Sequence, residues 1–441
     1  MDNSGMFVGL DIGTTSIKVI VAENVKGQMN VIGVGNERSE GLSRGVIVDI
    51  DKAVEAIKSA VRQAEEKASI QIQNVVVGIP ANMLSMEPCN GMITIDEQAR
   101  EITDQDVQSV ALSALTQNLP PEREVIDLQA EEFVVDGFDG IKDPRSMVGV
   151  RLEMRGMLFT GAKTIIHNTR KAVEQAGLSI ETMLVSPLAQ GKTVMSDGEQ
   201  DFGTILIDLG GGESTAAVIH DHRLKYTYTD DEGGAYITRD ISVVLNTSLD
   251  NAEKIKRDYG YADSLQASDD NEFPVEVVGQ SQPTQISERY LAEIVEARVG
   301  QIFSNLKQHL DSINALKLPG GIVLIGGVAA LPGIADLAAD TFGVTVRTYI
   351  PDQMGLRHPS FVQVLSLVTY RGQMSEIDLL VKSAANSTGD IQFNANESQF
   401  ESSNQSNKRR TASNRDREQQ PKKSKKKRGQ GIKSFFSDFF D

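Results

Sequence analysis

Residues 7–22 read FVGLDIGTTSIKVIVA, and residues 205–219 read ILIDLGGGESTAAVI. In both stretches an apolar strand ends in Asp, a glycine-rich turn with hydroxyl side chains follows, and a second apolar strand completes a hairpin. From Phe7 to about Arg371 short β-rich runs alternate with helical segments, which indicates an α/β chain with open sheets. The two hairpins therefore predict a duplicated lobe, with the copies facing each other across a cleft.

The glycine turns have the composition of a phosphate-binding site. Glycine lets backbone N–H groups approach a phosphate without a Cβ in the way, and hydroxyls add donors. An Asp at a strand end can hold Mg²⁺, usually through water, because that ion loses its water reluctantly. Residues 320–334, GGIVLIGGVAALPGI, run strand, double glycine, helix, and would admit a nucleoside at the helix start. One glycine-rich hairpin is more often only a turn, but three such elements in this order favour a nucleotide site.

Candidate binding residues follow from these elements. Lys18 would add a positive charge for the β- or γ-phosphate, and Asp11 and Asp208 are the candidate Mg²⁺ ligands. The chain contains neither a GxxxxGK[ST] loop nor a GxGxxG fingerprint, so the commoner nucleotide folds do not compete. The predicted nucleotide-binding set is Asp11, Gly13, Thr14, Thr15, Lys18, Asp208, Gly210, Gly211, Gly212, Ser214, Thr215, Gly326 and Gly327.

These elements resemble the phosphate-1, phosphate-2 and adenosine motifs of the actin, heat-shock chaperone and sugar-kinase superfamily. The resemblance implies two RNase H-like lobes that close on MgATP. Residues 252–260, AEKIKRDYG, are similar to the helix that the chaperone and bacterial-actin branches place against adenine. This would bring Glu253 and Lys256 to the base and ribose, and the alternative is that both are solvated helix charges.

One position departs from the superfamily pattern. A Glu or Gln commonly stands before a proline and orients the attacking water, whereas SPLAQG places Ser186 before Pro187. Serine is too short for that role, although Gln190, one turn later, could replace it. We therefore expect at most a slow ATPase. Bound ATP would mainly stabilise the closed lobes and promote self-association.

An insert over residues 84–161 identifies the branch. It contains a capping box from Thr103 to Asp106 and the strand EVIDLQAEEFVVDG, and it resembles the 1C subdomain of FtsA, the actin-like cell division family. The segments GLDIGTTSIKVIV, GLSRGVIVDIDKAVEAI, NVVVGIP and RHPSFVQVLSLVTY also resemble that family. The implied organisation is subdomain 1A at 1–83 and 346–385, 1C at 84–161, 2A at 162–231 and 313–345, and 2B at 232–312.

The C-terminal tail has its own composition. Residues 408–441 hold twelve Lys and Arg against four Asp and Glu, which gives this segment a net charge of +8. Because the whole chain has a net charge of −17, the rest of it carries −25. Residues 386–430 are rich in Asn, Ser, Gln, Lys and Arg, which predicts a disordered basic linker. An acidic body repels nucleic acid and anionic lipid, while the basic tail attracts either. A role of the basic run in nucleic-acid binding alone is the poorer alternative, because the phenylalanine stripe in GIKSFFSDFFD would then have no purpose, so we expect no nucleic-acid role.

Residues 431–441 predict an amphipathic helix that lies on a membrane. On a helix, the apolar residues share one face opposite Lys433, Ser434, Ser437 and Asp438. The alternative is a helix docked on the protein's own core, which the long linker disfavours. No apolar run is long enough to span a bilayer. The predicted membrane-binding residues are Ile432, Phe435, Phe436, Phe439 and Phe440.

The resemblance to FtsA implies a nucleotide-dependent scaffold on the cytoplasmic side of the cell membrane at the midcell division site. It implies head-to-tail polymers, attachment of the FtsZ ring through the FtsZ C-terminal tail at 2B, and recruitment of later divisome proteins. A pilus-assembly actin or a small-molecule kinase of the same fold are the alternatives. The single cysteine, Cys89, is interpreted as a packing residue, and the five histidines show no metal-ligand spacing.

Overall fold

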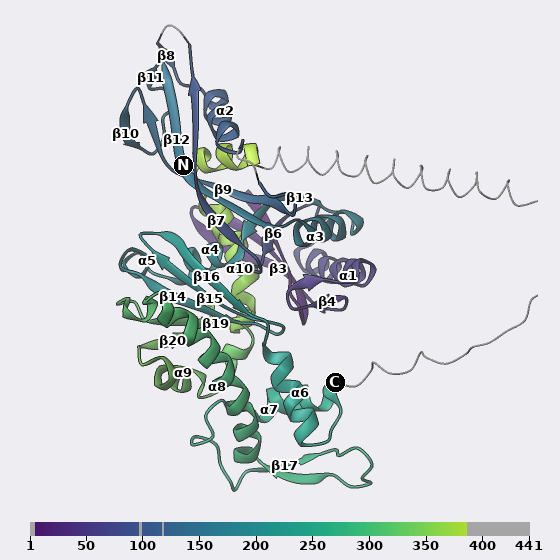
Figure 1. Ribbon diagram of the computed structural model, residues 1–441. Coiled ribbons are helices and arrows are strands. Elements are labelled where there is room, and N and C mark those ends of the chain that lie inside the picture. The colour runs from purple at the N-terminus through teal and green to yellow at the C-terminus, as the bar shows by residue number, and fades with distance from the viewer. Residues whose placement is uncertain (1–4, 97–98, 117–118, 386–441) are drawn as a thin grey trace, which may run out of the picture. The chain divides into compact units, whose positions relative to one another are not determined.

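The computed structural model describes residues 5–96, 99–116 and 119–385. The predicted linker and membrane helix lie outside these residues. Two five-stranded sheets dominate the described chain, and a four-stranded sheet and three two-stranded sheets accompany them (Figure 1). None of the described helices has the length and apolar character that crossing a membrane requires.

The first sheet has the strand order β13-β6-β1-β2-β3. Strands β1, β2 and β3 run antiparallel, and β6 and β13 lie parallel to β1 on its other side. The register places Asp11 opposite Lys18 at the end of the first hairpin. The strands are β1 (Gly5–Ile12), β2 (Ser16–Val25), β3 (Gln28–Arg38), β6 (Asn74–Ile79) and β13 (Ser179–Val185).

The second sheet repeats this plan in the order β16-β15-β14-β19-β20. Three antiparallel strands are again followed by two parallel ones, which confirms the duplicated lobe that the paired hairpins predict. The strands are β14 (Thr204–Leu209), β15 (Ser214–His220), β16 (Arg223–Asp230), β19 (Ile322–Ile325) and β20 (Val346–Thr348).

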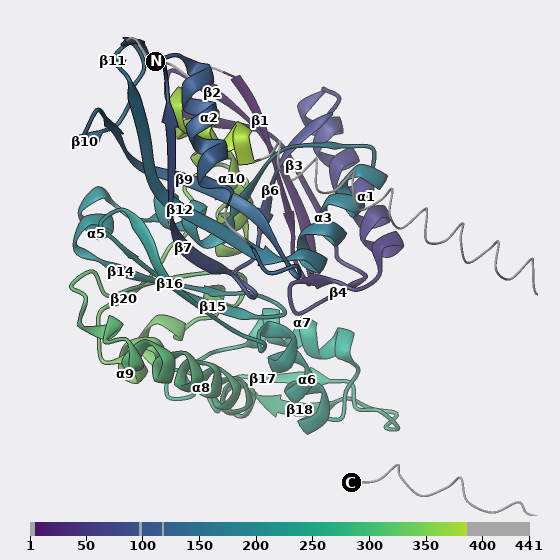
Figure 2. The same ribbon diagram turned by 45° about the horizontal axis from the view of Figure 1, so that its top comes forward.

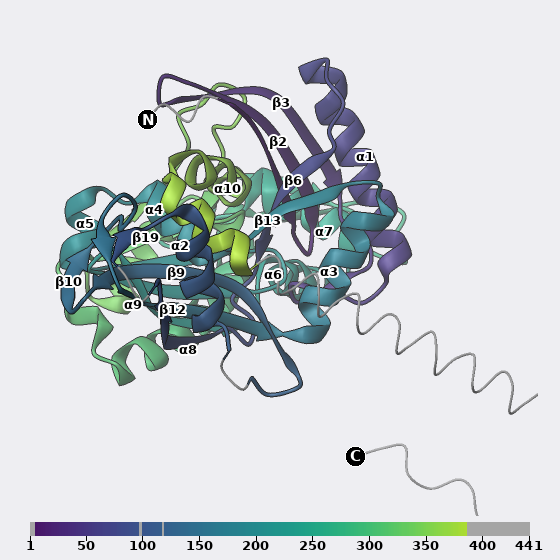
Figure 3. The ribbon, with the colours of Figure 1, turned by 90° about the horizontal axis from the view of Figure 1, so that it is seen from above.

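Helices cover both faces of the first sheet because its strands alternate apolar side chains between two cores. Helices α1 (Ile50–Ala68) and α3 (Lys163–Gln175) pack on the face that carries Val19 and Val21. Helix α10 (Val362–Gln373) packs on the face that carries Ile20 and Ala22. Figure 3 shows α1 and α10 on opposite sides of β2 and β3.

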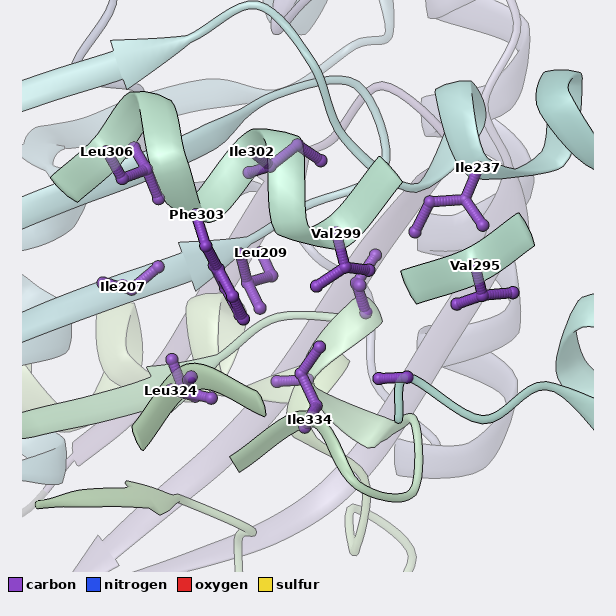
Figure 4. Close-up of a cluster of buried hydrophobic side chains, with 14 of the residues drawn as sticks. Ile207, Leu209, Ile237, Val295, Val299, Ile302, Phe303, Leu306, Leu324 and Ile334 are labelled. Carbon is purple, nitrogen blue, oxygen red and sulfur yellow. The ribbon is translucent and has the colours of Figure 1, made fainter. Parts of the chain in front are cut away.

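The second sheet packs its main core against α8 (Glu288–Ser312) and α9 (Ile334–Phe342). Figure 4 shows Phe303 of α8 beside Ile207 and Leu209 of β14. Phe303 has no exposed surface, and truncating such a side chain to Ala typically costs about 3–5 kcal/mol of stability. On its opposite face the sheet packs against α4 (Ser186–Val194), which carries the chain from β13 toward β14.

The insert is an antiparallel sheet in the order β10-β9-β12-β7, with α2 on one face. Thr103 and Asp106 form the predicted capping box at the start of α2, and Cys89 is only 4% exposed in this core. The elements are β7 (Ser85–Thr94), β8 (Arg100–Glu101), α2 (Asp104–Ala114), β9 (Arg123–Val135), β10 (Phe138–Ile141), β11 (Val148–Gly149) and β12 (Arg151–Ala162).

Away from the insert lie two helices and a hairpin that follow β16 (Figure 2). They are α6 (Gly234–Val244), α7 (Leu249–Tyr259), β17 (Glu272–Val275) and β18 (Thr284–Ser287). The remaining short elements are β4 (Leu42–Ser43), β5 (Val46–Ile47), α5 (Asp197–Phe202) and the 3₁₀ turns Ala315–Lys317, Val328–Ala330 and Pro359–Phe361.

Two parts of the segment 346–385 differ from its predicted place in subdomain 1A. Strand β20 pairs with β19, so residues 346–348 complete the second sheet. Residues 376–385 form a helix whose Val381, Ala384 and Ala385 lie in the core of the insert. Figure 3 shows this yellow helix beside α2. The stretch around α10 packs on the first sheet, and the final helix adds Leu379 to that packing while it supplies apolar side chains to the core of the small insert.

Candidate functional site

The two glycine turns lie against each other, as the paired hairpins predict. A Cβ added at Gly211 would stand 2.4 Å from both Oγ1 and Cγ2 of Thr15, and one added at Gly212 would stand 2.5 Å from Thr14 Oγ1. Only glycine fits at such an approach, because real Cβ atoms do not come this close to other atoms. The turns therefore form one cradle, with one side from each lobe.

Lys18 is buried, and Asp11 and Asp208 are partly buried, at the strand ends below the turns. Lys18 Nζ lies 3.6 Å from Asp11 Oδ2 and donates a hydrogen bond to Ser16 Oγ. Burial raises the pKa of Asp11, although the charge of Lys18 opposes the shift. Burial also raises the pKa of Asp208 to about 6, against a hydrogen bond from Gln190 and with a contribution from the charge of Asp11. Two carboxylates share one ammonium here, which suits an added cation.

The predicted nucleoside element borders this group. Gly326 has φ +91°, and a Cβ on it would stand 2.4 Å from Asp208 Oδ1, so the position requires glycine. Gly327 lies near Ser360, in the 3₁₀ turn that precedes α10. The element that follows the double glycine is itself a 3₁₀ turn, Val328–Ala330, and α9 begins only at Ile334. The structure thus brings the third element to the first two.

Glu253 and Lys256 of α7 lie close to the cradle but bind each other. Lys256 is 8% exposed, and its Nζ donates to Glu253 Oε2 at 2.6 Å, Thr238 Oγ1 at 2.8 Å and the carbonyl oxygen of Gly234 at 3.0 Å. Burial lowers the pKa of Lys256, although Glu253 opposes the shift. The backbone N–H of Gly234 in turn donates to the carbonyl oxygen of Gly210. The solvated alternative is therefore wrong for Lys256, while contact with base and ribose stays a prediction.

Two predicted hydroxyls hold strands together. Ser214 Oγ donates to the carbonyl oxygen of Glu232 at 2.8 Å, and Thr215 Oγ1 lies 3.1 Å from Thr229 Oγ1. Both side chains are buried. Thr14, by contrast, accepts a hydrogen bond from the backbone N–H of Gly45 at the edge of the cradle.

The structure adds Glu213 and Asn82, which sequence reasoning missed. Asn82 Nδ2 donates to Glu213 Oε2 at 2.6 Å, and a Cβ on Gly45 would stand 2.6 Å from the same oxygen. Burial raises the pKa of Glu213 to about 7 despite that hydrogen bond, and the charges of Asp208 and Asp231 add to the shift. Glu213 could have been found as the acidic residue in GGGES, but Asn82 carries no local signal.

Gln190, Gln363 and Ser186 form a hydrogen-bonded chain next to Asp208. Gln190 Nε2 donates to Asp208 Oδ2 at 2.6 Å and also to Gln363 Oε1, and Gln363 Nε2 donates to Ser186 Oγ. Gln190 is 2% exposed. Gln190, which the sequence suggests as a replacement for a longer residue at position 186, thus lies next to Asp208. The sequence did not indicate a role for Gln363.

Ion pairs at the surface also join the lobes. Arg38 Nη1 lies 3.3 Å from Asp250 Oδ1, and Arg44 Nη1 lies 3.2 Å from Asp231 Oδ2. All four side chains are more than half exposed, so solvent screens both pairs and they add little to stability. In the described residues no three His, Cys, Asp or Glu side chains gather as a metal cluster. A divalent ion here would rely on one or two carboxylates, water and a phosphate ligand, as Mg²⁺ usually does.

Comparison with known sequences gives consistent matches. The family model described as cell division protein FtsA matches residues 205–366, and the model described as the SHS2 domain inserted in FtsA matches residues 81–160. Cell division protein FtsA of Enterococcus hirae is 58% identical over 384 residues, which cover 87% of each chain. FtsA of Streptococcus pneumoniae is 51% identical over 89% of this chain and 85% of that protein. FtsA of Bacillus subtilis is 40% identical over 84% of each.

Solved structures share the fold at low sequence identity. A type IV pilus biogenesis complex of PilM and PilN matches with a TM-score of 0.57 at 16% identity, over 84% of this chain and 99% of that chain. MreB5 of Spiroplasma citri bound to ADP matches with a TM-score of 0.53 at 13% identity, over 83% and 96%. The same protein bound to AMPPNP gives 0.51.

Proposed function

The chain belongs to the FtsA family of cell division proteins and has their actin-like fold with the SHS2 (1C) insert, and on this premise we propose that it is a nucleotide-dependent scaffold. It binds MgATP between its lobes, assembles head to tail, and ties FtsZ to the cytoplasmic face of the cell membrane. At the division site it then recruits later divisome proteins.

The cradle of glycines carries the nucleotide proposal. Gly211 and Gly212 of one turn lie against the hydroxyl side chains of Thr15 and Thr14 of the other turn, so glycine backbone and hydroxyl donors from both lobes meet at one place. A phosphate group held there would contact both lobes, so ATP would stabilise their closed arrangement. The Spiroplasma citri proteins bound to ADP and AMPPNP have the same fold, which supports this type of ligand.

Mg²⁺ fits the donor set at the floor of the cradle. Asp11 and Asp208 are partly buried carboxylates, one from each lobe, and Lys18 forms an ion pair with Asp11. These two carboxylates would hold the ion through water, and the ion would neutralise phosphate charge. Lys18 would attract the phosphates, and Gly326 would admit the nucleoside.

ATP turnover is slow at best in this proposal. Ser186 is too short to reach a water at the phosphate, and the amide of Gln190 is already bound to Asp208 and Gln363. Neither group is a strong base. The nucleotide therefore serves chiefly to set lobe closure and polymer contacts.

The membrane proposal rests on the tail sequence. On a helix, Phe435, Phe436, Phe439 and Phe440 would share one face with Ile432, and each would contribute at most about 1.5–3 kcal/mol on full burial. Residues 421–428, PKKSKKKR, add roughly 1 kcal/mol per basic residue near anionic lipid. Two weak signals together make a reversible anchor for a peripheral protein.

FtsZ is proposed to bind subdomain 2B, roughly residues 232–312, through its C-terminal tail. Helix α8 passes through this region, and its buried face secures it to the second sheet. That rigid attachment would transmit force from FtsZ to the lobes and, through the tail, to the membrane.

Sedimentation with anionic liposomes tests the proposal. Full-length protein with MgATP should carry FtsZ into the pellet, and a chain that ends at Gln430 should leave FtsZ in solution. If the full-length protein binds liposomes and FtsZ stays in the supernatant, the tether function is wrong. Equal recruitment by the shortened chain would refute the tail as the anchor.

A further inference from the structure

The chain crosses between the two large sheets at two places that pack on each other. It leaves β13 through α4 toward β14, and it returns from β20 through residues 349–361 to α10. Gln190 and Ser186 stand on α4, and Gln363 stands on the first turn of α10. Any rotation of one lobe against the other takes place at these crossings, so contacts between them respond to lobe closure.

A chain of side-chain hydrogen bonds runs through this contact. Ser186 Oγ accepts from Gln363 Nε2, Gln363 Oε1 accepts from Gln190 Nε2, and Asp208 Oδ2 accepts from Gln190 Nε2 at 2.6 Å. Ser186 and Gln190 are 4% and 2% exposed. A Cβ on Gly78 would stand 2.9 Å from Gln363 Nε2 and 2.8 Å from Ser186 Oγ, so this position in β6 must stay glycine to leave room.

The order of these hydrogen bonds lets Gln363 fix the orientation of the Gln190 amide. A glutamine amide can present either its NH₂ or its oxygen to a neighbour, and only the NH₂ side can donate to the Asp208 carboxylate. Gln363 Oε1 takes the second N–H of Gln190, which favours this orientation. Gln363 is oriented in turn by its donation to Ser186. The Gln190 amide, which contacts the Asp208 carboxylate, is therefore held in place by the Gln363 amide, which does not contact that carboxylate.

We propose that Gln363 is a positioning residue of the nucleotide site, which keeps Gln190 on Asp208 and so aims this carboxylate at the magnesium ion of MgATP. The proposal rests on the proposed nucleotide function. Because Gln363 belongs to the first lobe and Asp208 to the second, the same contact couples the aim of the carboxylate to lobe closure. Opening of the α4 and α10 contact would free Gln190 and loosen Asp208.

Magnesium dependence of nucleotide binding tests this role. The affinity of full-length protein for a fluorescent ATP analogue would be measured with Mg²⁺ and with EDTA. In Gln363→Leu the gain in affinity from Mg²⁺ should fall about tenfold, in line with the loss of support for a hydrogen bond to a charged group. Affinity in EDTA should stay unchanged, which a general loss of structure would not allow. Gln190→Leu should cause the same loss, and the double variant no further loss.

Gln373→Leu, an exposed position on the same helix, is the matched control and should keep the full effect of Mg²⁺. Gln363→Asn keeps the amide but shortens the side chain, so the gain in affinity from Mg²⁺ should fall in this variant too. It tests the role even if Gln363→Leu fails to fold. An unchanged Mg²⁺ gain in either Gln363 variant, with wild-type binding intact, overturns the positioning role alone. Absence of any Mg²⁺-dependent binding in the wild type overturns the nucleotide function and this inference together.

Discussion

Asn82 and Glu213 join the two lobes by one hydrogen bond, in which Asn82 Nδ2 donates to Glu213 Oε2 at 2.6 Å. Asn82 follows the last residues of β6 in the first sheet, and Glu213 stands in the glycine turn of the second. The partly buried carboxyl group thus lies where the two lobes meet. Because burial raises its pKa to about 7, its charge depends on pH near neutrality.

Glu213→Gln should change how stability depends on pH. The folded-state pKa of Glu213 lies above the ordinary glutamate value of 4.5, so the stability linked to this proton is fully present below pH 4.5 and is lost as pH rises through about 7. Glutamine cannot ionise and still accepts from Asn82. Between pH 4.5 and about 8 the variant should therefore gain on the order of 3 kcal/mol relative to wild type.

Urea unfolding of both proteins at several pH values measures this gain. The same substitution at the exposed Glu66 should leave the pH dependence as it is. Parallel stability curves for wild type and Glu213→Gln would show that this carboxyl group does not carry the shift.

Gly211→Ala should weaken nucleotide binding. Its Cβ would meet Thr15 at 2.4 Å, so the turns must move apart, at a typical overpacking cost of about 1–3 kcal/mol. We expect affinity for an ATP analogue to fall roughly tenfold. Gly198→Ala in α5 is the control, since no atom lies within 4 Å of the added Cβ. Equal affinities for the two variants would contradict the cradle.

Lys382→Met should destabilise the insert together with the chain end. Lys382 pairs with Asp127 of β9, and their side chains are 7% and 2% exposed. Removing one partner of a buried ion pair leaves an uncompensated charge, which costs about 3–5 kcal/mol. The double variant Lys382→Met with Asp127→Leu should recover most of this loss in urea unfolding. If the double variant is as unstable as the single one, the ion pair is not the reason.

Phe435→Glu with Phe439→Glu should release the protein from membranes. The two charges fall on the apolar face of the tail helix, where insertion into lipid would require their burial. Ser434→Glu with Ser437→Glu adds the same charge to the polar face and should keep most of the protein in the membrane fraction. Fractionation of cells that express each variant measures the difference, and membrane retention of the phenylalanine variant would refute the tail as anchor.

Local sequence was sufficient for the lobes and the cradle. Alternating apolar residues around DIGTT and DLGGG indicate hairpins, and glycine at such turns leaves space that other residues would fill. The capping box at Thr103 is also a short-range pattern, and the structure contains it. These features are encoded within a few residues, because strand alternation, turn conformation and helix capping act over that distance.

Tertiary structure alone decided which distant side chains meet. Gln190 and Gln363 are 173 positions apart, Asn82 and Glu213 are 131 apart, and Asp127 and Lys382 are 255 apart. Nothing in the neighbourhood of any of these residues specifies its partner. The sequence by itself determined the two glycine-turn lobes, and the amphipathic tail stays its prediction. Only the folded chain decided that glutamines gather at the crossings and that the last described helix joins the insert. The reason is that these contacts depend on how whole sheets and helices pack, and periodicity within one segment carries no information about that packing.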